Sequence, residues 1–194
     1  MKKQILFIMI TGVILLLSAC GPKYEGDYSY PVDDFTFTNQ NGEQVSKSDF
    51  DGKIWIADFI YTTCETECPQ MTYSKQKIDR ALKDEGIEDV EFVSFSIDPE
   101  DDTPEVLKEY GEVRGIDFDK DNWTFLTGYD FDTIKEFAVK SFKVPVEKTK
   151  EDIFMHGVQL SIVSPEGNAI KYYNGLTLND EQIKEMVAFI EDMQ

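Results

Sequence analysis

The chain has 194 residues, of which 41% are hydrophobic, enough for one domain core and a targeting segment. Its 38 acidic residues outnumber 19 basic ones, which gives a formal net charge of −19 at pH 7. So acidic a chain repels the phosphates of nucleic acids and anionic lipid headgroups and attracts cations, which excludes nucleic acid as a partner.

The N-terminus has the pattern of a secretory signal peptide. Lys2 and Lys3 precede an apolar run over residues 5–17, which is shorter than the roughly 20 residues that a helix needs to span a bilayer. The run ends in Leu17-Ser18-Ala19-Cys20, which resembles a bacterial lipobox, with cleavage before Cys20 and lipid attached to its thiol. An uncleaved helix with an incidental cysteine is the alternative, but the small residues directly before the cysteine favour lipidation.

Cleavage before Cys20 divides the chain into three predicted parts: a signal peptide over 1–19, a lipid-attached tether over 20–33 and one domain over 34–194. The domain is then held at the cell membrane on its extracytoplasmic side, where a disulfide can persist. Because the anchor uses Cys20, two of the three cysteines remain for chemistry.

The first half of the predicted domain contains a hairpin, two buried strands and a helix between those strands. Asn41-Gly42 is a typical hairpin turn. The segment 54–61 is almost wholly apolar, which is typical of a buried central strand. In chain order, the predicted elements are strands at 35–38 and 43–45, a strand over 54–61, a helix from Pro69 to about Glu85 and a strand over 90–97.

Helix caps organise the second half. Thr103 is predicted to cap a helix that has Pro104 at its first position and ends near Gly115, and Asn179 or Asp180 caps the last helix. Between these helices we predict a strand over 123–127, a helix over 130–142 and a hairpin of strands 158–163 and 169–173.

Strands that alternate with helices imply parallel pairing with right-handed crossovers, to which the final hairpin adds an antiparallel edge. The predicted class is α/β. The order of elements resembles a thioredoxin-like core with an N-terminal β-hairpin and an inserted βα unit.

Two cysteines follow the predicted central strand, in Cys64-Glu65-Thr66-Glu67-Cys68-Pro69. Because proline disfavours helical geometry in the residue before it, Cys68 is predicted to be extended, with Pro69 opening the helix. The pair then lies in a loop at the carboxyl ends of the strands, where α/β proteins gather ligands. The helix start favours thiolate at Cys68, which Glu65 and Glu67 oppose until a cation arrives.

Three residues separate the two cysteines, against two in the redox motif Cys-x-x-Cys. The loop can close a disulfide if the two α-carbons come within about 7 Å. It also has room to spread two sulfurs around a metal. A purely structural disulfide is the alternative, although closing so short a loop stabilises little through chain entropy.

His156 is the only histidine in the chain and stands just before the strand predicted over 158–163. A lone histidine is more often structural or solvated than a ligand. In a thioredoxin-like fold, however, this segment passes beside the cysteine loop, and Gly157 allows close approach of the backbone. We therefore expect His156 to join Cys64 and Cys68. Such a set suits Cu(I), or Cu(II) if an oxygen or nitrogen completes the site, and zinc accepts the same ligands.

Four motifs occur in order along the domain. They are Cys64-x-x-x-Cys68-Pro69, Ser96-Ile97-Asp98-Pro99-Glu100-Asp101-Asp102-Thr103-Pro104, Trp123-x-Phe125-Leu126-Thr127-Gly128 and the distal His156. Together they resemble the Sco/SenC family, the copper-binding proteins of cytochrome c oxidase assembly. Cys-x-x-x-Cys alone is a weak signal, whereas the ordered set is specific. The lipobox is similar to that of Gram-positive members.

The resemblance implies a thioredoxin-like fold and binding of Cu(I) and Cu(II) by Cys64, Cys68 and His156. It also implies a role in building the CuA centre of cytochrome c oxidase subunit II. In the hypothesis that we favour, a Cys64–Cys68 disulfide form would be metal-free. The protein would then be a metallochaperone rather than a turnover enzyme, anchored to the membrane through lipid on Cys20.

Three other functions compete. The strongest is a thiol–disulfide oxidoreductase that keeps the CuA-site cysteines of subunit II reduced, with His156 as an auxiliary base. A peroxiredoxin-like peroxidase is disfavoured, because Ala57 and Tyr61 stand where the motif of such enzymes has proline and threonine. A redox or copper sensor on the membrane surface is compatible with the sequence.

Asp98 ends a strand beside the predicted site and is a candidate for orienting a ligand. The alternative for the run from Asp98 to Pro104 is a solvated loop that starts a helix, which already explains Asp101 and Asp102. Met71 and Met155 flank the site as candidate soft ligands, although gap filling in a core is the commoner role of methionine.

Overall fold

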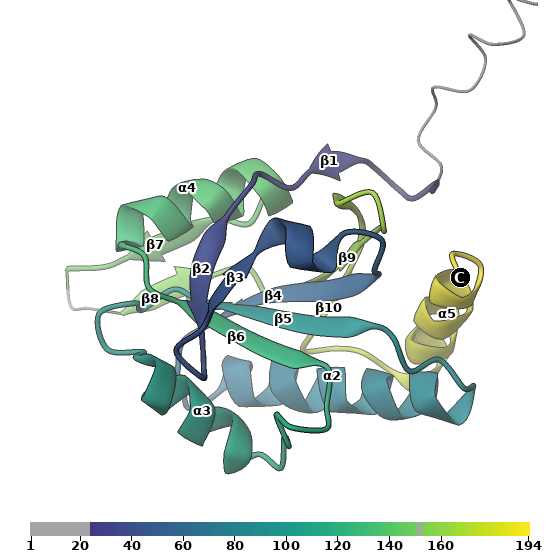
Figure 1. The fold of residues 1–194 in the computed structure, drawn as a ribbon, viewed down its shortest axis with the longest axis horizontal. Coiled ribbons are helices and arrows are strands. Elements are labelled where there is room, and N and C mark those ends of the chain that lie inside the picture. Colours follow the sequence, from purple (N-terminus) through teal and green to yellow (C-terminus); the bar gives the residue numbers. More distant parts are fainter. Residues whose placement is uncertain (1–23, 151–152) are drawn as a thin grey trace, which may run out of the picture.

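The computed structural model describes residues 24–150 and 153–194 (Figure 1). The predicted signal peptide and the lipid attachment site at Cys20 lie outside the described residues. Within the described ranges, no helix has the length and apolar character needed to cross a bilayer.

Ten strands are present in the described part of the chain. They are β1 (Tyr30–Pro31), β2 (Thr36–Asn39), β3 (Gln44–Ser46), β4 (Trp55–Ile60), β5 (Glu91–Ser96), β6 (Trp123–Thr127), β7 (Val146–Lys148), β8 (Phe154–His156), β9 (Gln159–Val163) and β10 (Asn168–Asn174). Eight of them form one sheet in the order β1-β10-β9-β4-β5-β6-β2-β3. The central β4, β5 and β6 are parallel, whereas β9 is antiparallel to β4 and β2 is antiparallel to β6. This topology confirms the α/β class and the antiparallel hairpin predicted beyond the parallel centre.

Helices cover both faces of the sheet. They are α2 (Glu67–Asp84), α3 (Pro104–Glu112), α4 (Phe131–Phe142) and α5 (Asp180–Glu191), with a 3-10 turn η1 (Lys47–Phe50) after β3. The side chains of β4 alternate between the two faces, so that Ile56 and Ile60 pack with α2, α3 and α5 while Trp55 and Phe59 pack with α4. Figure 1 shows α2 and α5 on the opposite side of the sheet from α4.

The starts predicted for α3 and α5 are present because their caps are local. The Val106 amide donates to the Thr103 hydroxyl at 3.4 Å, with Pro104 in the first turn. The Gln182 amide donates to the Asn179 side chain at 2.9 Å, which assigns the last cap to Asn179 rather than to Asp180.

Residues before position 34 also contact the sheet, while the boundary between tether and domain stays a prediction. Tyr30 and Pro31 form β1 against β10, the Tyr28 amide donates to the Ile170 carbonyl, and Val32 is buried. A strand of two residues carries no periodic pattern, and its pairing depends on β10 far along the chain.

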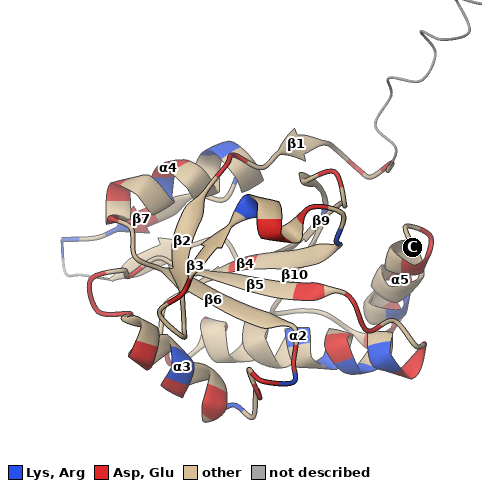
Figure 2. Ribbon diagram, viewed as in Figure 1, with Lys and Arg blue, Asp and Glu red and all other residues tan. Residues whose placement is uncertain are grey.

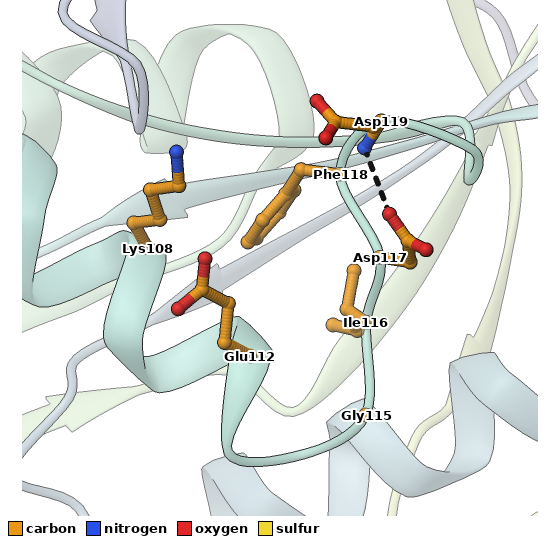
Figure 3. A pocket seen from close by; sticks show the side chains of 7 residues that line it. All are labelled: Lys108, Glu112, Gly115, Ile116, Asp117, Phe118 and Asp119. Atoms are coloured by element: carbon orange, nitrogen blue, oxygen red, sulfur yellow. Dashed lines mark hydrogen bonds between the residues drawn. The ribbon is translucent and has the colours of Figure 1, made fainter.

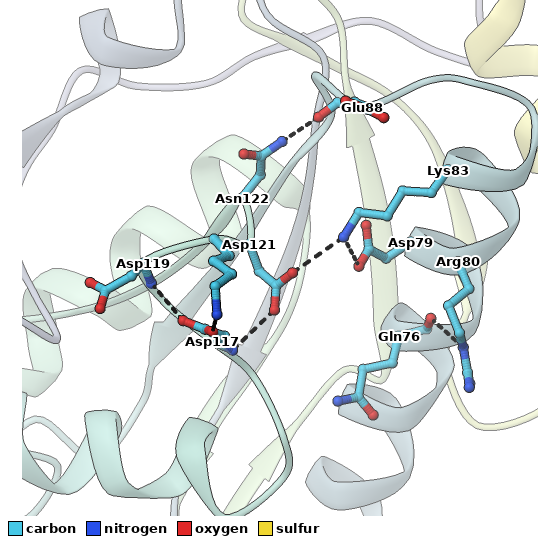
Figure 4. A network of polar contacts seen from close by, with 10 residues as sticks. Gln76, Asp79, Arg80, Lys83, Glu88, Asp117, Asp119, Asp121 and Asn122 are labelled. Carbon is cyan, nitrogen blue, oxygen red and sulfur yellow. Dashed lines mark hydrogen bonds and ion pairs between the residues drawn. The ribbon is translucent and has the colours of Figure 1, made fainter.

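Charged side chains lie mainly on helices and loops, as Figure 2 shows. Lys83 on α2 contacts Asp79 at 3.0 Å and Asp121, in the loop before β6, at 3.2 Å. In the same network, the Asn122 side chain donates to the Glu88 carbonyl (Figure 4). These contacts fasten the loop before β6 to the end of α2, on the side of the molecule away from the cysteines.

Candidate metal centre

The predicted site residues come from three elements that meet at the carboxyl end of β4. Cys64 follows β4 in the loop to α2, Cys68 lies in the first turn of α2, and His156 ends β8, a strand paired with β7. The pairing of His156 with Val146 in this small sheet fixes the position of His156 beside the cysteine loop. Sequence patterns do not reveal this small sheet, because each of its strands has only three residues.

The prediction that Cys68 is extended is wrong. The helix begins at Glu67, with Thr66 as its cap, so Cys68 is helical and Pro69 is the third helical residue. Proline is tolerated in the first turn because the amides there lack an intrahelical partner. The Cys68 amide, which also lacks such a partner, donates to Cys64 Sγ at 3.4 Å.

Cys68 is the central member of the group. Its Sγ lies 3.6 Å from Nε2 of His156, although the two residues are 88 positions apart. The Nδ1 atom of His156 lies 3.0 Å from the Gly157 carbonyl oxygen, which can only accept a hydrogen bond. Nδ1 therefore carries the proton and Nε2 presents its lone pair toward the Cys68 sulfur.

The sulfur of Cys64 contacts Cys68 and Glu67. Its Sγ accepts from the Cys68 amide and donates to Oε2 of Glu67 at 3.7 Å. Both cysteines are buried free thiols. A Cys64–Cys68 disulfide is therefore not formed in this structure, which represents the reduced state.

The electrostatic environment distinguishes the two thiols. Burial raises the pKa of Cys64, but hydrogen bonds from the Cys68 and Thr66 amides outweigh it, and the net pKa lies below its ordinary value. Deeper burial raises the pKa of the Cys68 thiol far above its ordinary value. Burial also lowers the pKa of His156, so its imidazole is neutral at pH 7 and able to bind a metal.

The donor types fit a soft cation, but the three groups are not preassembled around one point. Among the described residues, no three His, Cys, Asp or Glu side chains already form a metal-binding cluster. Two sulfurs and a neutral imidazole are suitable donors for Cu(I). Cys68 contacts both Cys64 and His156, so a cation held by all three donors would lie beside Cys68.

A hollow of about 210 Å³ opens beside His156. It is lined by Tyr61, Glu67, Phe154, Met155, His156 and Val158. A larger hollow of about 390 Å³ lies at the end of α3 and is lined by Lys108, Glu112, Gly115, Ile116, Asp117, Phe118 and Asp119 (Figure 3). The larger one contains neither sulfur nor imidazole, so we take the smaller one as the entrance to the site.

The two candidate methionines differ in position. Met71 is fully buried in the core between α2 and the sheet. Met155 is 57% exposed and lines the hollow beside His156.

The carboxylate that supports the cysteine loop is that of Asp102, which sequence analysis assigned to a solvated helix start. It accepts from the Thr62 amide, the Thr62 hydroxyl and, at 2.6 Å, the Ser96 hydroxyl. The chain immediately before Cys64 is thereby tied to the end of β5. No hydrogen bond joins the Asp98 carboxylate to Cys64, Cys68 or His156 in the described part of the chain, and an orienting role for Asp98 stays a hypothesis.

Asp98→Asn is expected to stabilise the protein in a pH-dependent way. Burial, and then the charge of Asp102, raise the pKa of Asp98 to about 6, against about 3.9 in an unfolded chain. Ionising Asp98 therefore costs stability as the pH rises through this interval. The gain in melting temperature over wild type should grow from about pH 4 to about pH 6 and then stay constant. A gain that shrinks above pH 6 would contradict this assignment.

A buried ion pair lies beneath the site. Asp58 in β4 and Lys75 in α2 are fully buried, and Nζ of Lys75 donates to Oδ1 of Asp58 and to the Ser94 hydroxyl at 2.6 Å each. The same Nζ lies 4.9 Å from the centre of the Trp123 ring. The pair was not predicted from the sequence, although the charged Asp58 inside an otherwise apolar strand indicates a buried partner.

Comparison with known proteins identifies the family. The SCO1/SenC family model matches residues 26–191. A curated relative from Bacillus subtilis, the SCO1 protein homolog, is 45% identical over 166 residues, which cover 84% of each chain.

Solved structures agree with this match. A SCO1/SenC family lipoprotein from Bacillus anthracis superimposes with a TM-score of 0.79 at 34% identity, covering 84% of this chain and 95% of the other. BsSco, described as a Sco protein of cytochrome c oxidase assembly with a disulfide switch, gives 0.78 at 40% identity, with 89% and 98% covered. The copper-bound ScoI of Arabidopsis thaliana gives 0.70 at 25% identity, with 82% and 98% covered. These similarities confirm the thioredoxin-like fold.

Proposed function

The chain belongs to the SCO1/SenC family, and from its sulfur–imidazole cluster we propose that it is a copper chaperone. Copper is its cargo, held by Cys64, Cys68 and His156. Its recipient is the CuA site of cytochrome c oxidase subunit II. The protein binds and transfers the metal and does not turn over a substrate.

One observation carries this proposal: the 3.6 Å approach of Cys68 Sγ to Nε2 of His156. The Gly157 carbonyl fixes the tautomer in which Nε2 is unprotonated, so no proton must leave the imidazole before it binds a cation. The copper-bound Arabidopsis relative and the assembly role of BsSco support copper as the cation.

Capture of Cu(I) then follows from the protonation states. The two thiols lose their protons to solvent as the cation binds, and the neutral imidazole adds the third donor. Cys64 ionises first because the amides of Cys68 and Thr66 lower its pKa. Delivery proceeds by ligand exchange, in which thiolates of the recipient replace Cys64 and Cys68 one after the other.

The protein is proposed to act at the membrane surface. A lipid on Cys20 anchors it, and the domain lies on the extracytoplasmic side. The lipobox and the Bacillus anthracis lipoprotein support this location.

Thiol–disulfide exchange is the second candidate function, and the unequal thiols favour it. Cys64, with the lower pKa, would attack a disulfide of the recipient, and Cys68 would resolve the mixed disulfide. Two electrons pass to the recipient, and a Cys64–Cys68 disulfide remains, which an external dithiol must reduce. The disulfide switch of BsSco supports such a cycle.

Copper titration of the reduced and oxidised domain separates the two functions. Reduced protein is expected to bind one copper ion per chain, and the Cys64–Cys68 disulfide form none, because oxidised sulfurs lack thiolate lone pairs. His156→Ala should weaken copper binding by at least about tenfold while leaving thiol–disulfide exchange intact. Equal copper uptake by reduced wild type, His156→Ala and the disulfide form would refute the chaperone proposal.

A further inference from the structure

Glu67 lies at the mouth of the site, beside the hollow that opens at His156. It is the first residue of α2, and its carboxylate folds back over the cysteine loop. Among the described residues that line the hollow beside His156, it is the one with a carboxylate.

Glu67 contacts the cysteine loop and lines the hollow that His156 also lines. Its Oε2 accepts from the Cys64 sulfur at 3.7 Å and from the Thr66 hydroxyl. It faces the same hollow as His156. Because its side chain is exposed, it can turn toward a cation without breaking core packing.

The other acidic groups near the cysteines are committed elsewhere. Asp58 is buried against Lys75, and Asp102 is bound to Thr62 and Ser96. Glu65, two residues before Glu67, is exposed and does not line the hollow.

The two oxidation states of copper differ in what they need. Cu(I) is satisfied by two thiolates and an imidazole, whereas Cu(II) prefers a tetragonal set completed by oxygen or nitrogen. Two thiolates leave a Cu(I) site with one negative charge and a Cu(II) site neutral. One carboxylate added to Cu(II) restores the same net charge.

We infer that Glu67 supplies an oxygen ligand to copper when the site holds Cu(II). When the site holds Cu(I), the carboxylate does not bind the metal and stays at the mouth of the site. This inference rests on the proposed function and names the fourth ligand of the same site. Glu67 thereby favours the oxidised over the reduced metal and makes affinity depend on oxidation state.

Glu67→Gln and its matched control Glu65→Gln test the inference, since both remove one negative charge from the segment between Cys64 and Cys68. Glu67→Gln is expected to weaken Cu(II) binding by about tenfold to a hundredfold, with a changed electron paramagnetic resonance spectrum of the bound Cu(II). Its Cu(I) affinity should match that of wild type, which also shows that the variant is folded. Glu65→Gln should match wild type in all three measurements.

Three results would overturn the inference. They are wild-type Cu(II) affinity and spectrum in Glu67→Gln, equal losses in both variants, or equal loss of Cu(I) and Cu(II) in Glu67→Gln. In each case, copper binding by wild type leaves the proposed function standing. Wild type that takes up no copper overturns both.

Discussion

Cys68→Ser is expected to lower the affinity for Cu(I) by more than about a hundredfold, beyond what loss of a supporting residue around a metal produces. Cys68 is the member of the cluster that contacts both others, with His156 Nε2 at 3.6 Å from its sulfur and Cys64 Sγ on its amide. A serine hydroxyl is a hard donor that stays protonated, so Cu(I) would keep only Cys64 and His156.

Competition of the reduced protein with a chromophoric Cu(I) chelator measures this affinity. Thr63→Ser is the matched control, because Thr63 is exposed in the same loop and adjoins Cys64. It should bind copper as wild type does. Retention of wild-type affinity by Cys68→Ser would remove Cys68 from the ligand set.

Lys75→Met is expected to lower the free energy of unfolding by about 3–5 kcal/mol, because it leaves the Asp58 charge buried without a partner. Lys75 and Asp58 are both 0% exposed, and Oδ2 of Asp58 has no hydrogen-bond partner even with Lys75 in place. In the double variant Asp58→Asn with Lys75→Met, the loss should be smaller than the sum of the two single losses, since the residues form one network.

Urea denaturation gives these free energies. Lys135→Met is the matched control, because Lys135 pairs with Glu147 at 2.7 Å on the surface, where such pairs contribute about 0–1 kcal/mol. A Lys75→Met protein as stable as Lys135→Met would show that the buried pair does not carry the stability assigned to it.

Most of the fold is predictable because its signals are local. Thr103, Asp130 and Asn179 each accept a backbone hydrogen bond three residues along, so each cap requires only its own segment. β1 escapes prediction because its two residues pair with β10, far along the chain. β7 and β8 pair with each other, and each has only three residues, too few for a periodic pattern.

The place of the cysteines in the fold was predictable, but the backbone conformation of Cys68 was not. The central strand and the following helix place Cys64 and Cys68 at the carboxyl end of the sheet. The rule that a residue before proline avoids helical geometry gave the wrong conformation for Cys68. A helix can accommodate proline in its first turn, and α2 does so at Pro69. The assignment of Cys64, Cys68 and His156 as copper ligands stays a prediction.

Supporting groups were missed because they act across strands. The role of Asp102 depends on Thr62 and Ser96, which belong to the loop after β4 and to the neighbouring strand β5. Lys75 depends on Asp58 in β4 and Ser94 in β5. Neither relation is a periodicity or a motif in the sequence.

X-ray absorption spectroscopy of the reduced, Cu(I)-loaded domain tests most directly whether one metal joins both sulfurs and the imidazole. Two sulfur neighbours and one imidazole nitrogen are expected in wild type, and the nitrogen contribution should disappear in His156→Ala. A wild-type spectrum without sulfur neighbours, or one that His156→Ala leaves unchanged, would contradict the proposed site.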